Sequence, residues 1–403
     1  MSELGKFPQQ LLKEHWQERL NYFQSCKVPH ERMAAVCTEI KNAIRCRAGQ
    51  GFIFVVGPTR IGKTTALDYV FKSLLAESMD EMLNDPGCIP VAKMEACAYH
   101  RGYDWKDHWI GCLQALNEPL IEYKYQPPVF DSGPPARVFI RERKSGTIMR
   151  RSFEEAARQR KLRVFCLDEA QHLTLVPSSK MYRAQVEIIK SVASQSKAMH
   201  VLFGTYDLLK LRNASGQLGS RAVTVHFDRY RHNSRPDLKA FADALLSLTA
   251  HMPLSERPNL DKDLDYCFDV SLGCVGLLKV WLADTLGAVL EEGRKTLSRK
   301  DLEKHEPPTD VLDKISLEIC DGETRLRQDD QKRGLIRLRM RGGDGRTDLA
   351  QPPESSEPNQ SPAVSGAPTS DPNSRARTHQ KKSKSKKIER KPKRDGVGQG
   401  RKK

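Results

Sequence analysis

Residues 57–64 read Gly57-Pro58-Thr59-Arg60-Ile61-Gly62-Lys63-Thr64 and fit the pattern G-x-x-x-x-G-K-[ST] of phosphate-binding loops. Gly57 and Gly62 stand where the backbone must curl around phosphate oxygens, because a Cβ there would block the close approach of main-chain N–H groups. Lys63 brings a positive charge toward the β- and γ-phosphates, and Thr64 offers a hydroxyl to Mg²⁺. Residues 57–65, with Thr65 as the last of them, therefore predict a nucleotide site that also holds Mg²⁺.

The sequence on both sides of this loop supports the same interpretation. Phe52-Ile53-Phe54-Val55-Val56 is an apolar run of the length of a buried strand, and it ends directly before Gly57. After the loop, apolar residues recur at helical spacing from Ala66 to Leu75. The order of strand, loop and helix favours a nucleotide site over a glycine-rich turn without a ligand.

Two adjacent carboxylates follow a second apolar run. Leu162-Arg163-Val164-Phe165-Cys166-Leu167 predicts a buried strand that ends in Asp168-Glu169. Ligands of α/β sheets gather at the carboxyl ends of strands, where Asp168 can hold Mg²⁺ through water and Glu169 can orient or deprotonate an attacking water. The pair is therefore the expected catalytic partner of the loop.

Further candidates for the site lie in the next segment. The run His200-Val201-Leu202-Phe203-Gly204 ends in Thr205, which is either a contact to the γ-phosphate or its water, or a plain turn residue. Arg212, Arg221 and Arg229 are candidates for an arginine finger that reaches the phosphate of a neighbouring subunit. Arg221 is the first choice, and an ordinary salt bridge is the alternative for each of the three.

Length and composition bound the class of protein. The chain has 403 residues, enough for one large or two modest domains. No run approaches the ~18 uninterrupted apolar residues of a membrane span. The first residues lack the charged-then-apolar form of a signal peptide, so we expect a cytoplasmic protein without membrane contact. The 10 Cys are scattered without a C-x-x-C pair, which favours reduced core residues over zinc or redox chemistry.

The positive charge is concentrated at the end of the chain. The formal net charge is +16, and residues 371–403 hold 14 Lys and Arg against 3 Asp and Glu, a balance of +11. This composition, without aromatic residues, cannot bury enough apolar surface to fold. We expect the segment to contact DNA or an acidic partner in a salt-dependent way, or to act only as a solubilising appendage.

Changes in pattern along the chain predict five parts. They are an N-terminal helical segment (1–50), an α/β nucleotide-binding domain (51–235), a helical lid (236–315), a charged and partly ordered connector (316–341) and a disordered basic tail (342–403).

Two segments inside the α/β domain have alternative interpretations. Residues 136–151 predict a basic hairpin that turns at Lys144-Ser145-Gly146, and its charges are either a solvated face or a contact to the DNA backbone. Trp105 and Trp109 stand one helical turn apart, which favours packing in a helix core over a platform for base stacking.

Four segments together resemble the TnsC/TniB family of AAA+ transposition regulators. They are the loop 57–64, Leu167-Asp168-Glu169-Ala170-Gln171-His172-Leu173, the pair Gly204-Thr205, and the helix entry Gly273–Gly276. The form D-E-x-Q-H-L is the most specific, since other AAA+ proteins share only the Asp-Glu. The resemblance spans about residues 28–295 and leaves the basic tail uncovered. It implies an AAA+ P-loop NTPase domain, with a parallel sheet flanked by helices and a small C-terminal helical lid.

The resemblance also implies an activity, cofactors and partners. Such proteins hydrolyse ATP with Mg²⁺, form homo-oligomeric rings or filaments on double-stranded DNA, recruit a transposase and receive signals from a target-selection protein. Lys63 would clamp the phosphates, Thr64 and Asp168 would hold Mg²⁺, Glu169 would be the catalytic base, and Thr205 would sense the γ-phosphate. The chain departs from many AAA+ proteins in carrying Lys279 where an Arg is expected as a second sensor.

Two other functions fit the same sequence. One is an AAA+ ATPase of another pathway, initiator-like or secretion-linked, since a fold does not fix a function. The other is a basic-tailed adaptor that binds nucleotide with negligible hydrolysis. Glu169 argues against the adaptor, because a protein that only binds nucleotide does not need a catalytic base.

Overall fold

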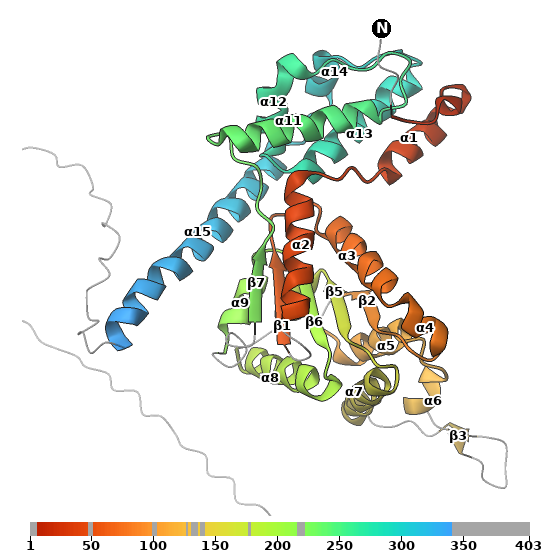
Figure 1. The fold of residues 1–403 in the computed structure, drawn as a ribbon, viewed down its shortest axis with the longest axis vertical. Helices are drawn as coiled ribbons and strands as arrows, with labels where there is room; N and C mark the ends of the chain where they lie inside the picture. The colour runs from red at the N-terminus through yellow and green to blue at the C-terminus, as the bar shows by residue number, and fades with distance from the viewer. Residues whose placement is uncertain are drawn as a thin grey trace, which may run out of the picture. The chain divides into compact units, whose positions relative to one another are not determined.

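A five-stranded parallel sheet forms the centre of the α/β domain in a computed structural model of the chain (Figure 1). The structure describes residues 6–46, 51–98, 103–125, 128–129, 136–137, 142–175, 179–215 and 222–340. The chain divides into two compact units, 1–345 and 346–403, and the described residues belong to the first. The predicted tail, 342–403, lies outside the described residues.

The strand order places the strand that leads into the phosphate-binding loop, β1, between β6 and β7. The order is β2-β5-β6-β1-β7, and every pairing is parallel. The strands are β1 (Gly51–Val56), β2 (Val91–Glu95), β5 (Val164–Asp168), β6 (Met199–Gly204) and β7 (Ala222–His226). Because parallel strands have their carboxyl ends at one edge, the residues that follow β1, β5 and β6 meet there.

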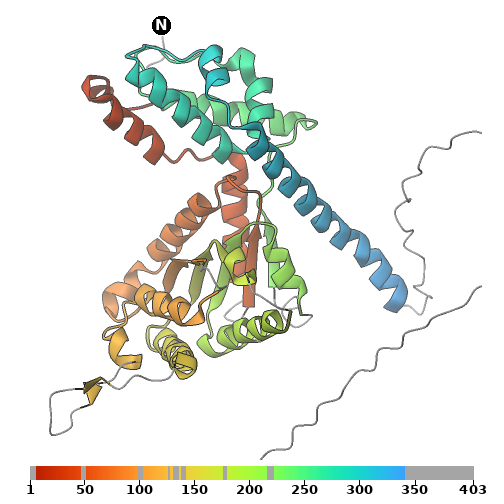
Figure 2. The same ribbon diagram turned by 180° about the vertical axis from the view of Figure 1, so that it is seen from behind.

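Helices cover both faces of the sheet (Figures 1 and 2). Side chains alternate along β1, so that Ile53 and Val55 pack toward one face and Phe52 and Phe54 toward the other. The first face carries α2 (Glu31–Cys46) and α3 (Lys63–Glu77). The second carries α5 (Trp105–Ala115), α7 (Glu142–Gln159) and α8 (Ser179–Ser196). The predicted α/β fold with a parallel sheet flanked by helices is confirmed.

Shorter elements connect these layers. They are α4 (Met79–Asn84), α6 (Ile121–Tyr125), the strands β3 (Pro128–Val129) and β4 (Ala136–Arg137), the 3-10 helix η2 (Ala170–Thr174) and α9 (Leu208–Asn213).

The predicted basic hairpin over residues 136–151 is wrong. Ala136–Arg137 pairs in antiparallel fashion with Pro128–Val129, and the predicted turn and second strand lie within α7. The physical reason is the spacing of Met149, Phe153 and Ala157, which are all buried on one side of α7 against the sheet. Burial of this stripe outweighs the turn preference of Ser145-Gly146.

A helical subdomain follows the sheet, in the segment predicted as the lid. Its helices are α11 (Arg235–Ala250), η3 (Asp261–Asp263), α12 (Leu264–Ser271), α13 (Val275–Glu291) and α14 (Arg299–Lys304). Phe23 of the N-terminal helix α1 (Trp16–Ser25), which follows η1 (Gln9–Lys13), belongs to the same core as Phe241 and Trp281. The long helix α15 (Thr309–Met340) comes next, and it runs across the boundary predicted at 315/316.

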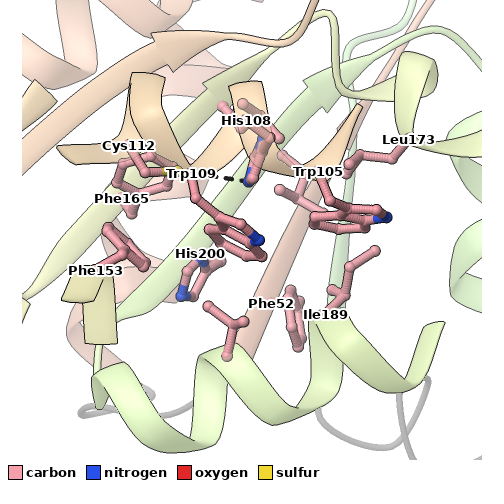
Figure 3. A pocket seen from close by; sticks show the side chains of 13 residues that line it. Phe52, Trp105, His108, Trp109, Cys112, Phe153, Phe165, Leu173, Ile189 and His200 are labelled. Atoms are coloured by element: carbon pink, nitrogen blue, oxygen red, sulfur yellow. Dashed lines mark hydrogen bonds between the residues drawn. The ribbon is translucent and has the colours of Figure 1, made fainter. Parts of the chain in front are cut away.

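A cluster of aromatic and histidine side chains fills the second face of the sheet (Figure 3). The Trp109 ring stacks on Trp105 at 5.2 Å and on Phe153 at 5.9 Å, and Trp109 is buried. The two tryptophans therefore belong to the core, as favoured from the sequence. The cavity among these side chains has a volume of about 30 Å³, which is close to the space of one water molecule.

Two histidines in this cluster make the stability of the fold depend on pH. Burial lowers the pKa of His108 to about 3 and that of His200 to about 4, from 6.5. The folded state thus holds both rings neutral, while the unfolded chain takes up protons below about pH 6.5. We expect the free energy of unfolding to fall as pH drops from about 6.5 to 4, by on the order of 3 kcal/mol per histidine.

Urea unfolding at a series of pH values measures this loss. His200→Gln should be less stable at neutral pH and should show a shallower pH dependence, whereas the same change at the exposed His15 should leave the wild-type profile. A wild-type profile in His200→Gln would contradict the assignment of the proton uptake to this ring.

Among the described helices, no single one is long and apolar enough to cross a membrane. The segments Asp261–Ser271 and Val275–Glu291 meet the criteria of length and composition only as a pair, and they are bent by 112°.

All ten cysteines are free, and six of them are buried, in agreement with reduced core residues.

Candidate active site at the carboxyl edge of the sheet

The phosphate-binding loop connects β1 to α3. Gly62 precedes α3 with φ 111°, a left-handed conformation that glycine adopts without strain. A Cβ at Gly57 would lie 2.5 Å from the carbonyl oxygen of Phe227, which follows β7. The two glycines of the motif are thus required by the backbone itself. Arg60 of the loop is exposed, and Ile61 is buried beneath it.

Lys63 begins α3 and lies within the loop. Its Nζ donates hydrogen bonds to the carbonyl oxygens of Gly57 at 3.2 Å and of Pro58 at 2.7 Å. Burial lowers the pKa of the ammonium group, and the nearby carboxylates of Glu169, Glu318 and Asp168 oppose this shift. A desolvated cation inside a glycine-containing loop is suited to a phosphate group.

Thr64 and Asp168 meet across the sheet, as the sequence predicts. The Thr64 hydroxyl donates to Oδ2 of Asp168 at 2.7 Å, although the residues are 104 positions apart. Asp168 is the last residue of β5, and Thr64 lies in the first turn of α3 with the partly exposed Thr65. A hydroxyl and a carboxylate oxygen at this distance are oxygen ligands of the kind that Mg²⁺ prefers, so these residues fit the ion.

Glu169 is held by a residue that the sequence analysis gave no role. Gln171 donates from Nε2 to the Glu169 carboxylate, and its Oε1 accepts from the backbone N–H of Thr205 at 3.2 Å. A Cβ at Gly204 would lie 2.4 Å from that Oε1, so Gly204 makes room for the amide. Gln171 therefore links the predicted base to the predicted sensor. The signal for it was present in the D-E-x-Q-H-L segment.

Thr205 and the candidate arginines make contacts within their own chain. The Thr205 hydroxyl accepts from the backbone N–H of Asp207 at 3.4 Å, as a turn residue does. Arg212 donates to the Thr224 hydroxyl at 3.0 Å, and Arg229 donates to Glu323 at 3.0 Å. Arg221 lies outside the described residues. The role of an arginine finger stays a prediction for all three.

The lid contacts the loop through Gly276. A Cβ at Gly276 would lie 2.2 Å from the carbonyl oxygen of Arg60, so the first turn of α13 rests on the loop backbone. Lys279, one turn further along, donates to the carbonyl oxygens of Gln24, at 2.8 Å, and of Cys26. The lysine found at the position of a second sensor thus contacts the last turn of α1 and the residue that follows it.

Helix α15 also reaches the loop, which the sequence analysis missed. The Thr59 hydroxyl donates to Oε2 of Glu318 at 2.8 Å, across 259 positions of the chain. No local pattern points to this contact, because it depends on how α15 packs after the lid.

Comparisons with known proteins agree with the class of fold. Residues 46–211 match the family model described as AAA domain. No curated protein is significantly similar in sequence to this chain. The α/β domain is therefore a P-loop domain of the AAA+ class.

Several solved structures are similar at low identity. The ORC2 protein of Aeropyrum pernix, in ADPNP–ADP complexes, has 14% identity and a TM-score of 0.47, covering 71% of this chain and 70% of that one. The Walker-type ATPase of Pyrococcus abyssi has 14% identity and a TM-score of 0.43, covering 76% and 77%. Domain III of the replication initiation protein DnaA of Thermotoga maritima has 11% identity and a TM-score of 0.39, covering 71% and 97%. Likenesses this distant say nothing about activity.

Proposed function

We propose that this chain is an ATP-hydrolysing regulator of DNA transposition, which assembles as a ring or filament on duplex DNA and links a target-selection protein to a transposase. The observation that supports hydrolysis is the meeting of two pairs at one edge of the sheet. Thr64 and Asp168 share a hydrogen bond, and Glu169 is joined to Thr205 through Gln171.

Each of these residues has a distinct task in the proposed reaction. Lys63 neutralises charge on the β- and γ-phosphates, for which its ammonium must leave the carbonyl oxygens of Gly57 and Pro58. Thr64 and Asp168 would hold Mg²⁺, which screens phosphate charge when bound. Glu169 accepts the proton of the attacking water, and Gln171 sets the direction of that carboxylate.

The role in transposition depends on the segment Leu167–Leu173, whose D-E-A-Q-H-L form resembles the TnsC/TniB family. Double-stranded DNA, a transposase, a target-selection protein and further copies of the chain are the partners this role requires, and the cytoplasm is the expected location. The basic residues 371–403 supply charge for a polyanion. An initiator-like ATPase would share the site and the DNA, but not the transposase.

Assembly on DNA gives a test of this function. With an arginine supplied by a neighbouring subunit, each site is complete only in the oligomer, so hydrolysis per subunit should rise with protein concentration and with added duplex DNA. The measurement is ATP turnover across a dilution series, with and without DNA, alongside electron microscopy with a non-hydrolysable ATP analogue.

The same specific activity at every dilution, unchanged by DNA, would argue against assembly. ATP-dependent binding of a transposase encoded by a neighbouring gene would support the role in transposition. Assembly on DNA without such binding would favour an initiator-like ATPase.

A further inference from the structure

Helix α15 packs over the nucleotide loop and the sheet edge beside it. Ile315 and Ile319, on its first turns, are buried in the same cluster as Ile61 of the loop and Val225 of β7. The helix also approaches closely at Gly322, where a Cβ would lie 2.1 Å from the ring of Tyr206. A glycine at this point allows the helix backbone to rest directly on the aromatic ring.

Two carboxylates of α15 hold it to the site. Oε2 of Glu318 accepts from the Thr59 hydroxyl, and among the described residues its buried Oε1 has no hydrogen-bond partner. Glu323, whose side chain is 5% exposed, accepts from Arg229 at 3.0 Å and from Arg231 at 3.3 Å. The contacts therefore join α15 to the loop at one point and, at another, to the two arginines that follow β7 in the sequence.

The charge of Glu318 opposes the ligand that the loop is built to bind. A triphosphate brings several negative charges to the loop that contains Thr59, and the carboxylate of Glu318 lies within hydrogen-bond distance of that loop. In a partly buried site, like charges repel more strongly than they do in water. The empty loop therefore favours α15 in contact, and a bound triphosphate favours its removal.

We propose that α15 is a strap over the nucleotide site that a bound triphosphate displaces, and that its release frees Arg229 and Arg231 from Glu323. The proposal rests on the proposed function only in that the loop binds ATP. It adds a regulatory step: the strap reduces nucleotide affinity, and Arg229 becomes available for a neighbouring subunit or for DNA only after nucleotide has bound, while Arg231 keeps its pairing with Asp228.

The first test is the affinity for a fluorescent, slowly hydrolysed ATP analogue. Glu318→Gln keeps the shape and the acceptor for Thr59 but removes the charge, so it should bind the analogue roughly tenfold more tightly than the wild type. Asp321→Asn is the matched control, since it removes one carboxylate from the same helix, where Asp321 pairs only with Arg325 in the described structure and is 61% exposed. The control should bind with wild-type affinity.

The second test follows the strap directly by hydrogen exchange of residues 309–328. Adding the analogue to the wild type should speed their exchange. Gly322→Ala should do the same without nucleotide, because its methyl group would collide with Tyr206. Alanine has a higher helix propensity than glycine, so the substitution does not itself weaken the hydrogen bonds of α15. Faster exchange would therefore result from the loss of packing against Tyr206. Gly146→Ala, in a helix where a Cβ meets nothing within 4 Å, is the control.

The outcomes separate this proposal from the proposed function. If the wild type binds the analogue but Glu318→Gln shows no gain and the exchange of α15 does not change on binding, the strap is overturned and the ATPase stands. If the wild type does not bind the analogue, both proposals fail.

Discussion

Replacing Lys63 with Ala should abolish nucleotide binding or reduce ATP turnover by roughly a hundredfold or more. The ammonium is the positive charge inside the loop, and it lies against the carbonyl oxygens of Gly57 and Pro58. Without it, the phosphates would meet backbone amides alone, and two carbonyl oxygens would lose their donor. The measurement is the equilibrium affinity for the fluorescent ATP analogue, followed by steady-state turnover.

Lys72→Ala is the matched control for this substitution. Lys72 is on the same helix and is exposed, so its loss changes the net charge equally without touching the loop. Thermal unfolding of both variants shows whether they remain folded. Undiminished turnover in a folded Lys63→Ala protein would remove the loop from the proposed mechanism.

Glu169→Gln should retain ATP and hydrolyse it roughly 10²- to 10⁴-fold more slowly. Glutamine has nearly the size of glutamate and can still accept a hydrogen bond from Gln171, but it cannot take a proton from water. Binding and chemistry should therefore separate, with the analogue still bound and a large loss in single-turnover rate. This variant is also the one expected to accumulate as an ATP-bound assembly on DNA.

Glu187→Gln controls for the loss of a carboxylate elsewhere. Glu187 lies on α8, where its exposed side chain pairs with Lys190 at 2.7 Å. The control should keep wild-type turnover. A wild-type single-turnover rate in Glu169→Gln would show that another group accepts the proton.

The central strands could be predicted because their signal is local. Phe52–Val56 and Val164–Leu167 are continuous apolar runs, which are typical of buried parallel strands. β7 gives a weaker signal, because its β-branched residues Val223, Thr224 and Val225 form only a short run in a strand at the edge of the sheet. α7 was misread because a turn-forming pair stands inside a helix whose register is set by burial of Phe153.

The same distinction applies to the site. The meeting of Thr64 with Asp168 could be expected, since a parallel sheet brings the residues after its strands to one edge. The link from Glu169 through Gln171 to Thr205 needs side-chain geometry, which spacing does not supply. The contact of Glu318 with Thr59 depends on the packing of a helix that follows the lid, and no sequence pattern near either residue predicts it.

The contact of Gly276 with Arg60 has a mechanical consequence. Because no side chain lies between them, a displacement of the loop backbone moves the first turn of α13 directly. α13 has 17 residues, so it is roughly 25 Å long, and a small tilt at its pivot becomes a shift of several ångström at Glu291. α13 therefore acts as a lever whose short arm rests on the loop backbone, and any residue larger than glycine at position 276 would change the position of the helix there.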